Sequence, residues 1–268
     1  MISRAIACGF FLSLALWACP GASFANSPGV GRVYVLSLSS SREVDPPMMQ
    51  ERGQRSAQMV LLAAKQRFPK ASSYHLVEPG AGRNTEFGSS FKEALRTLTA
   101  ELRTEDTVIL YTHSHGTPKG LLIDGGISWR DYGETLLSLR ARNVIVFTMS
   151  CFSGGLVDYL RSVRSRWEGR AQEGRGFLVI SAQNASRSAG PVKIGNKRMN
   201  GLPFAVAQAF QFADGYSGRP RDGVLDFDEF SEYVYAVSRS AGSNFRYFND
   251  SQRVSSYPVG QRLSTTGN

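Results

Sequence analysis

Two apolar segments of the chain each lead to a residue that can do chemistry. Cys151 follows the apolar segment 143–148, and His115 lies just beyond the apolar segment 107–111. A thiolate is the attacking species in cysteine chemistry, and a neighbouring imidazole can accept the proton of the thiol. The pattern therefore predicts a nucleophilic site in which Cys151 is the nucleophile and His115 is its base.

Glycines accompany both of these residues. Gly116 directly follows His115, and because it has no Cβ, its backbone N–H can lie close to a reacting carbonyl group. Together with the N–H of Cys151, it would form an oxyanion hole. Gly154 and Gly155 would let the chain turn sharply behind the nucleophile.

The rest of the chain supplies a sheet that would bring the two segments together. Short apolar runs alternate with amphipathic stretches, which is typical of an α/β fold with a mostly parallel sheet flanked by helices. Parallel strands lie about 5 Å apart, and ligands bind beyond their carboxyl ends, so Cys151 and His115 are expected to face each other there. The predicted strands are 33–38, 74–77, 107–111, 143–148 and 176–181. The predicted helices are 54–67, 89–102, 128–140, 203–212 and 227–237.

These segments resemble the sequence blocks of the caspase-fold cysteine peptidases, a clan that includes legumain-like, metacaspase-like and clostripain-like enzymes. In that clan an apolar strand ends in His-Gly, and a later apolar strand ends in a small residue, Cys and often Ser-Gly. Segments 108–116 and 144–154 look like these two blocks, and 177–184 is similar to the strand and loop that help line the S1 pocket. The resemblance covers residues 30–237 and implies a caspase-like three-layer sandwich.

By this resemblance, His115 is the catalytic histidine and Cys151 the nucleophile, and the two act as a dyad that needs no third acid. The implied reaction is attack on a peptide carbonyl, formation of a thioester acyl-enzyme, and hydrolysis. Transfer of the acyl group to an amine is an alternative outcome, because some legumain-like members are transpeptidases. The tentative substrate-binding residues are His113, Met149, Ser150, Ala182, Gln183 and Asn184.

The chain departs from the clan two residues before the cysteine. Met149 stands where caspases commonly have Gln and legumains Glu, so a preference for the P1 residue, which precedes the scissile bond, does not carry over. Arg52 and Arg55 are candidates for a basic pocket residue, and a solvated helix face is the alternative for both. A catalytically inactive caspase-like binding module is therefore a second interpretation of the chain.

Two rival interpretations use the histidine segment itself. Residues 112–116 differ from the Gly-x-Ser-x-Gly of serine hydrolases only in their first residue, which would make Ser114 the nucleophile of an esterase. No histidine follows His115, where that fold would need its base.

His113 and His115 would point to one face of a strand, as in zinc hydrolases, but the further ligands of such a site do not follow.

An acidic segment near the C-terminus is similar to the second half of a calcium loop. Segment 222–230 has Asp, Gly and Glu at suitable places, but the first and third ligand positions fall on Gly218 and Pro220. A helix N-terminus rich in acids is the simpler interpretation, and calcium would need Asp214 and a nonstandard loop. We therefore expect no cofactor and no resident metal.

The N-terminus is typical of a secretory signal peptide. Arg4 precedes the apolar run 5–18, and small residues lead to an expected cleavage after Ala25. The run is too short to span a bilayer. A competing interpretation takes 16–19 as a lipoprotein box that would leave a lipid anchor on Cys19. Either way the protein is expected to be exported, and periplasmic or secreted.

The predicted organisation is a signal peptide over 1–25, one peptidase domain over 26–239 and a polar C-terminal tail over 240–268. Cleavage would leave Cys151 as the only cysteine, or one of two with Cys19 retained. An unpaired cysteine in an exported protein indicates a reactive thiol.

The net charge bears on the partners of the protein. It is +9, so removal of Arg4 would leave 9 − 1 = +8. The arginines are spread along the chain without basic runs interleaved with aromatics, which argues against nucleic acid. The expected partner is a protein or peptide substrate.

Overall fold

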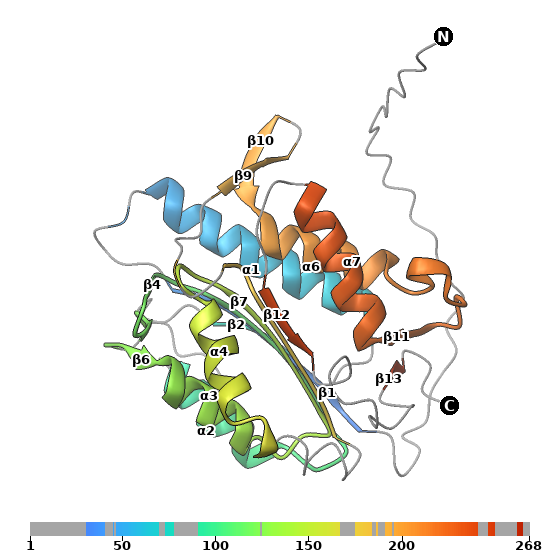
Figure 1. Cartoon of the computed structure of the whole chain (residues 1–268), viewed down its shortest axis with the longest axis horizontal. Helices are drawn as coiled ribbons and strands as arrows, with labels where there is room; N and C mark the ends of the chain where they lie inside the picture. Colours follow the sequence, from blue (N-terminus) through green and yellow to red (C-terminus); the bar gives the residue numbers. More distant parts are fainter. Residues whose placement is uncertain are drawn as a thin grey trace.

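The computed structural model describes residues 31–40, 45, 47–69, 73–77, 91–123, 125–166, 175–183, 186, 191–194, 196–240, 246–249 and 262–264. Its centre is a six-stranded sheet with the order β12-β8-β7-β3-β1-β2 (Figure 1). Five neighbouring strands run parallel: β1 (Val33–Ser39), β2 (Ser73–Val77), β3 (Thr107–His113), β7 (Asn143–Met149) and β8 (Gly176–Ser181). At one edge, β12 (Arg246–Asn249) pairs antiparallel with β8.

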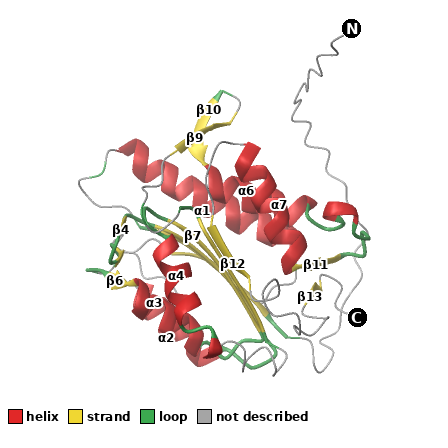
Figure 2. Cartoon of the chain, in the orientation of Figure 1, coloured by secondary structure: helices red, strands yellow, loops and turns green. Residues whose placement is uncertain are grey.

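Helices cover both faces of the sheet, which gives three layers (Figure 2). One face carries α1 (Pro47–Arg67), α6 (Gly201–Phe212) and α7 (Phe227–Ser240). The other face carries α2 (Phe91–Glu101), α3 (Trp129–Ser138) and α4 (Gly154–Ser162). The expected α/β class with a mostly parallel sheet between helices is confirmed.

Short elements complete the described part of the chain. A three-stranded sheet is formed by β4 (Gly116–Thr117), β5 (Gly120–Leu121) and β6 (Ile127–Ser128). A hairpin is formed by β9 (Pro191–Ile194) and β10 (Lys197–Asn200). The 3-10 helix η1 (Tyr216–Gly218) precedes β11 (Val224–Asp226), which pairs with β13 (Arg262–Ser264).

The central strands are apolar at consecutive positions because both of their faces are buried. In β3, Val108 and Leu110 pack into the cluster under α2, α3 and α4. Ile109 and Tyr111 pack into the cluster under α1, α6 and α7. Successive side chains of a strand point to opposite faces, so a strand between two helical layers has no polar side.

The parallel register brings the ends of the strands together. Ser39 of β1 is the partner of His113 in β3, and His113 is the partner of Met149 in β7. Residues that follow β3 and β7 therefore leave the sheet side by side, at what we call its carboxyl end. This is the position in which open parallel sheets bind ligands.

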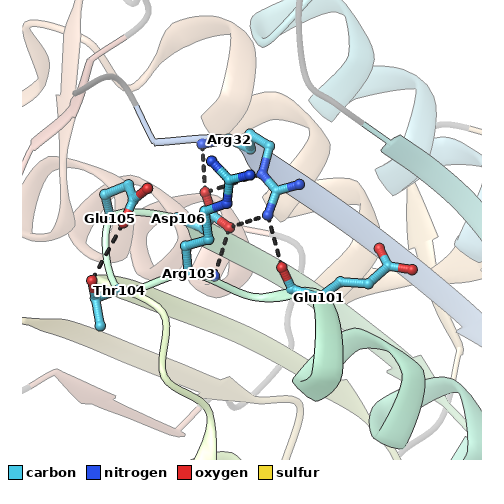
Figure 3. A network of polar contacts seen from close by, with 6 residues as sticks. All are labelled: Arg32, Glu101, Arg103, Thr104, Glu105 and Asp106. Carbon is cyan, nitrogen blue, oxygen red and sulfur yellow. Dashed lines mark hydrogen bonds and ion pairs between the residues drawn. The ribbon is translucent and has the colours of Figure 1, made fainter. Parts of the chain in front are cut away.

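The opposite end of the sheet, which we call its amino end, is held by a buried carboxylate (Figure 3). Asp106 is fully buried and accepts from the N–H of Arg32 at 2.8 Å, from Nη2 of Arg32 at 3.0 Å and from the N–H of Arg103 at 2.9 Å. Its own carbonyl accepts from the N–H of Arg142 at 2.8 Å. A buried charge is tolerated when it is paired and hydrogen-bonded, so this network joins the starts of β1, β3 and β7.

The structure differs from the sequence prediction mainly in the connections. Helix α1 begins at Pro47 rather than at residue 54, and proline is favoured at a first helical position because its missing N–H has no helical partner there. Helix α4 and the β9–β10 hairpin were not predicted. The segment predicted as a polar tail supplies both β12 and β13.

The predictions about the N-terminus fall outside the residues that the structure describes. The predicted signal peptide and the lipid site at Cys19 lie outside them. Within them, no helix combines the length and the apolar character needed to cross a bilayer.

Candidate active site

Cys151 and His115 meet at the carboxyl end of the sheet. Each lies two residues beyond a register pair, because His113 is opposite Met149. The N–H of Ser114 donates to the carbonyl of Met149 at 3.3 Å, so the pairing continues one residue past β3. Both Cys151 and His115 line one cavity of about 150 Å³.

The cavity has walls from several parts of the chain. They come from the loop after β1, the first turns of α1, the ends of β3 and β7, and the β9–β10 hairpin. A cavity of about 150 Å³ is the size that accommodates a benzene molecule. It is therefore large enough for a single side chain of a substrate.

Asp45 holds the imidazole of His115. The Nε2 atom of His115 lies 2.9 Å from Oδ1 and 2.8 Å from Oδ2 of Asp45. The side chain of Asp45 is 9% exposed and that of His115 is 31% exposed, so the carboxylate lies behind the ring and the ring itself is accessible. The carbonyl of Asp45 accepts from Nε2 of Gln50 at 2.9 Å, which fixes the loop to the start of α1.

His113, which was predicted to bind substrate, forms part of the cavity wall. Its Nδ1 lies 3.5 Å from Oγ of Ser39, and its Nε2 lies 3.3 Å from Nδ2 of Asn200. Gly53 of α1 packs against the ring, and a Cβ there would come within 2.6 Å of Nδ1. Both nitrogens of His113 have protein partners, and these differ from the partner of His115. This arrangement does not support a zinc ion shared by the two histidines.

Burial keeps His113 uncharged. The loss of solvent lowers its pKa from 6.5 to about 4, and the charge of Arg52 and any positive charge on His115 act in the same direction. The carboxylate of Asp45 acts weakly in the opposite direction. At neutral pH, His113 is therefore a neutral hydrogen-bonding group beside His115.

The turn after the nucleophile contains a strained residue. Phe152 has a φ of 58°, a left-handed conformation that is rare for a bulky side chain and costs of order 1–3 kcal/mol. Gly154 and Gly155, predicted to make the sharp turn, instead form the first turn of α4. The half-buried Cys151 is thus held between the end of a strand and the start of a helix.

Gly116 packs directly against the nucleophile segment. A Cβ on Gly116 would lie 2.1 Å from Oγ of Ser150 and 2.2 Å from the carbonyl oxygen of Cys151, so no other residue fits without a shift. The hydroxyl of Ser150 also donates to this carbonyl at 3.0 Å. The two segments that were predicted to supply the oxyanion hole are therefore in contact, and the hole itself stays a prediction.

The predicted substrate-binding residues separate into three groups. The cavity lining includes His113, Met149 and Ser150. Ala182 and Gln183 are not part of that lining: Ala182 is buried in the apolar core, and Gln183 is half-buried and donates its N–H to Oγ of Ser153 at 3.3 Å. A role of these two residues in substrate binding stays a prediction. Asn184 lies outside the described residues.

The two candidate arginines have different positions. Arg52 is half-buried and lines the cavity, whereas Arg55 is exposed and forms an ion pair with Glu51 on the solvent side of α1. The position of Arg52 thus agrees with its interpretation as a basic pocket residue, and that of Arg55 agrees with a solvated helix face.

Sequence reasoning missed several residues of the site. The most important is Asp45, since the dyad prediction named no acid; the others that line the cavity include Met49, Pro191 and Asn200. The one signal for Asp45 is its place between the first strand and Pro47, where a loop reaches the carboxyl end of the sheet. Nothing in the sequence pattern indicates its contact with a histidine 70 positions away.

The acids of the suspected calcium segment have protein partners. Oδ1 of Asp226 accepts from the N–H of Glu229 at 2.8 Å, and Oε2 of Glu229 accepts from the N–H of Asp226 at 3.4 Å, which is a capping box at the start of α7. Oε1 of Glu229 accepts from the N–H of Gly215, and Asp214 pairs with Arg67. Burial, then the charge of Asp226, raises the pKa of Glu229. In the described part of the chain, no three His, Cys, Asp or Glu residues group as metal ligands.

The site has the parts that a cysteine nucleophile needs. A thiol and an imidazole line one cavity, a carboxylate orients the imidazole, and Ser114 is buried with its Oγ bonded to no other described residue. Ser114 lines the same cavity, but it is buried and its Oγ has no hydrogen-bonded base among the described residues, whereas Cys151 is half-buried, so its exposure favours Cys151 as the nucleophile. Comparison of the chain with family models and with curated proteins finds no match.

Proposed function

We propose that the protein is an exported cysteine endopeptidase with a caspase-like fold, in which Cys151 and His115 cleave peptide bonds. The observation that carries the proposal is that both residues line one cavity at the carboxyl end of a parallel sheet, with the imidazole held by Asp45. The strained turn at Phe152 is a second support, because such backbone outliers cluster at active sites.

The reaction follows from the chemistry of the two groups. His115 accepts the thiol proton, and the sulfur of Cys151 attacks the carbonyl carbon of the scissile bond. The N–H groups of Gly116 and Cys151 would stabilise the resulting oxyanion. The imidazolium then gives its proton to the leaving amine, which leaves a thioester. Water deprotonated by His115 cleaves the thioester and restores the thiol, and an amine in place of water gives transpeptidation.

The cavity beside the nucleophile favours an acidic P1 side chain. Arg52 is the lining residue with a permanent positive charge, and no carboxylate of the described residues forms an ion pair with it. Asp45, the one carboxylate in the described lining, is bonded to His115. A short substrate carboxylate of a size that fits about 150 Å³ would therefore satisfy Arg52.

A peptide library that varies only P1 tests this function. We expect the wild-type protein to cleave peptides under reducing conditions and Cys151→Ala to lose at least about 10³-fold in kcat/KM. Ser114→Ala is the matched control and should keep most of the activity, whereas an esterase would show the reverse pattern. If the wild type cleaves no member of the library and Cys151 remains unreactive, the chain is an inactive binding module and the proposal is wrong.

A further inference from the structure

The contact between Asp45 and His115 specifies which nitrogen of the ring carries hydrogen. An ionised carboxylate only accepts hydrogen bonds, and both of its oxygens lie within 2.9 Å of Nε2 of His115. Nε2 is therefore the nitrogen that donates. In the neutral ring, the other nitrogen, Nδ1, then has the lone pair.

We propose that Asp45 is a positioning residue that fixes His115 as the Nε2–H tautomer, so that Nδ1 exchanges the proton with Cys151. This inference rests on the proposed function and turns the predicted dyad into a three-residue system. The carboxylate also stabilises the imidazolium that forms when the thiol proton moves to the ring.

The charges around His115 explain why the cavity needs this carboxylate. Arg52 of α1 adds a positive charge on one side, and His113 at the end of β3 is neutral, with its pKa lowered to about 4 by burial and nearby positive charge. Protonation of His115 would therefore place two positive charges in one small cavity. The carboxylate of Asp45 supplies one negative charge that offsets these two positive charges. The thiolate of Cys151 supplies a second negative charge once its proton has moved to His115.

The position of Asp45 depends on backbone contacts as well as on the ion pair. Its carbonyl is held by the side chain of Gln50, and α1 begins two residues later at Pro47. The carboxylate is thus placed before substrate arrives, which is what an orienting group requires. Asp45→Asn keeps this shape while removing the charge, so it separates the electrostatic role from packing.

Kinetics of Asp45→Asn test the proposal. We expect kcat to fall about 10²-fold with little change in KM, because a neutral amide can hold the wrong tautomer and does not stabilise the imidazolium. The rate at which iodoacetamide alkylates Cys151 at neutral pH should also fall, because the imidazolium that accompanies the thiolate loses its carboxylate partner. Asp45→Glu should restore part of the rate. Glu51→Gln is the matched control, since it removes a carboxylate from the solvent side of α1 and should change neither value.

A measurement of the tautomer makes the test independent of turnover. In Cys151→Ala labelled with ¹⁵N histidine, NMR at neutral pH should show His115 protonated on Nε2, and Asp45→Asn in that background should reduce this preference. Protonation on Nδ1, or an Asp45→Asn enzyme with unchanged kcat and alkylation rate, would overturn the inference while leaving the cysteine hydrolase intact. A wild type without activity and with a slowly alkylated Cys151 would instead remove the proposed function.

Discussion

The two ends of the sheet each place an aspartate against a basic group, but the two contacts serve different purposes. At the amino end, Asp106 is fully buried and is bonded to Arg32 and to two backbone segments. At the carboxyl end, Asp45 contacts an imidazole that is 31% exposed and lines a cavity. A guanidinium keeps its proton, whereas an imidazole can exchange one near neutral pH. The first contact therefore stabilises the fold, and the second is suited to proton transfer.

The two arginines show the same contrast. The guanidinium of Arg32 bonds Asp106 and the carbonyl of Glu101 at 2.7 Å (Figure 3). Arg52 lines the cavity, and no ion pair joins it to a carboxylate of the described residues. A satisfied charge holds segments together, while a charge directed at a cavity is available to a ligand.

The largest effect is expected at the amino end. Asp106→Ala would leave the buried N–H groups of Arg32 and Arg103 without an acceptor, at about 1–3 kcal/mol for each. We expect the free energy of unfolding to fall by about 3 kcal/mol, measured by urea denaturation. Glu101→Ala is the control, because its backbone carbonyl remains while its exposed side chain is lost. Equal stability of the two variants would show that the buried carboxylate of Asp106 does not stabilise the amino end of the sheet.

A smaller effect is expected from the cavity arginine. Arg52→Gln should lower kcat/KM for peptides with an acidic P1 residue by about 10- to 100-fold, since a charge-assisted hydrogen bond is lost. Peptides with a neutral P1 residue should change little. Arg55→Gln, three positions further along α1 and on its solvent side, should leave both values unchanged. If both variants behave alike, Arg52 has no role in substrate choice.

The smallest effect concerns acid stability at the carboxyl end. The pKa of His113 is lowered from 6.5 to about 4, so the unfolded chain takes up the proton first as pH falls. The stability that neutral His113 contributes is present above about pH 6.5 and is lost as the pH falls toward about 4, by about 1–2 kcal/mol for a half-buried ring. Urea unfolding at several pH values should show a shallower acid dependence in His113→Gln than in the wild type. Identical slopes would mean that His113 is not held neutral.

The sequence predicts the sheet well because the strands are buried on both faces. Segments such as Val144–Phe147 are apolar at every position, which is typical of strands buried on both faces. Cys151 and His115 are recognisable because each lies just beyond such a strand. Strand β12 was not recognised, since an edge strand from a polar segment has no comparable pattern.

The rest of the site depends on contacts between distant parts of the chain. Asp45 and Arg52 belong to a loop and a helix whose local sequence is ordinary, and only the folded arrangement brings them to the cavity. Asn200 reaches His113 across 87 positions through the β9–β10 hairpin. Contacts of this kind leave no periodic signal in a single sequence, so they were not predictable from it.

The rate at which iodoacetamide alkylates Cys151 tests the central claim most directly. With His115 as its base, the thiol of the native wild type should react at least about tenfold faster near neutral pH than the thiol of His115→Ala or of the unfolded chain. Mass spectrometry of the labelled peptide would follow the reaction at this residue alone. Equal rates in the wild type and in His115→Ala would contradict the account, because the imidazole would then have no influence on the sulfur.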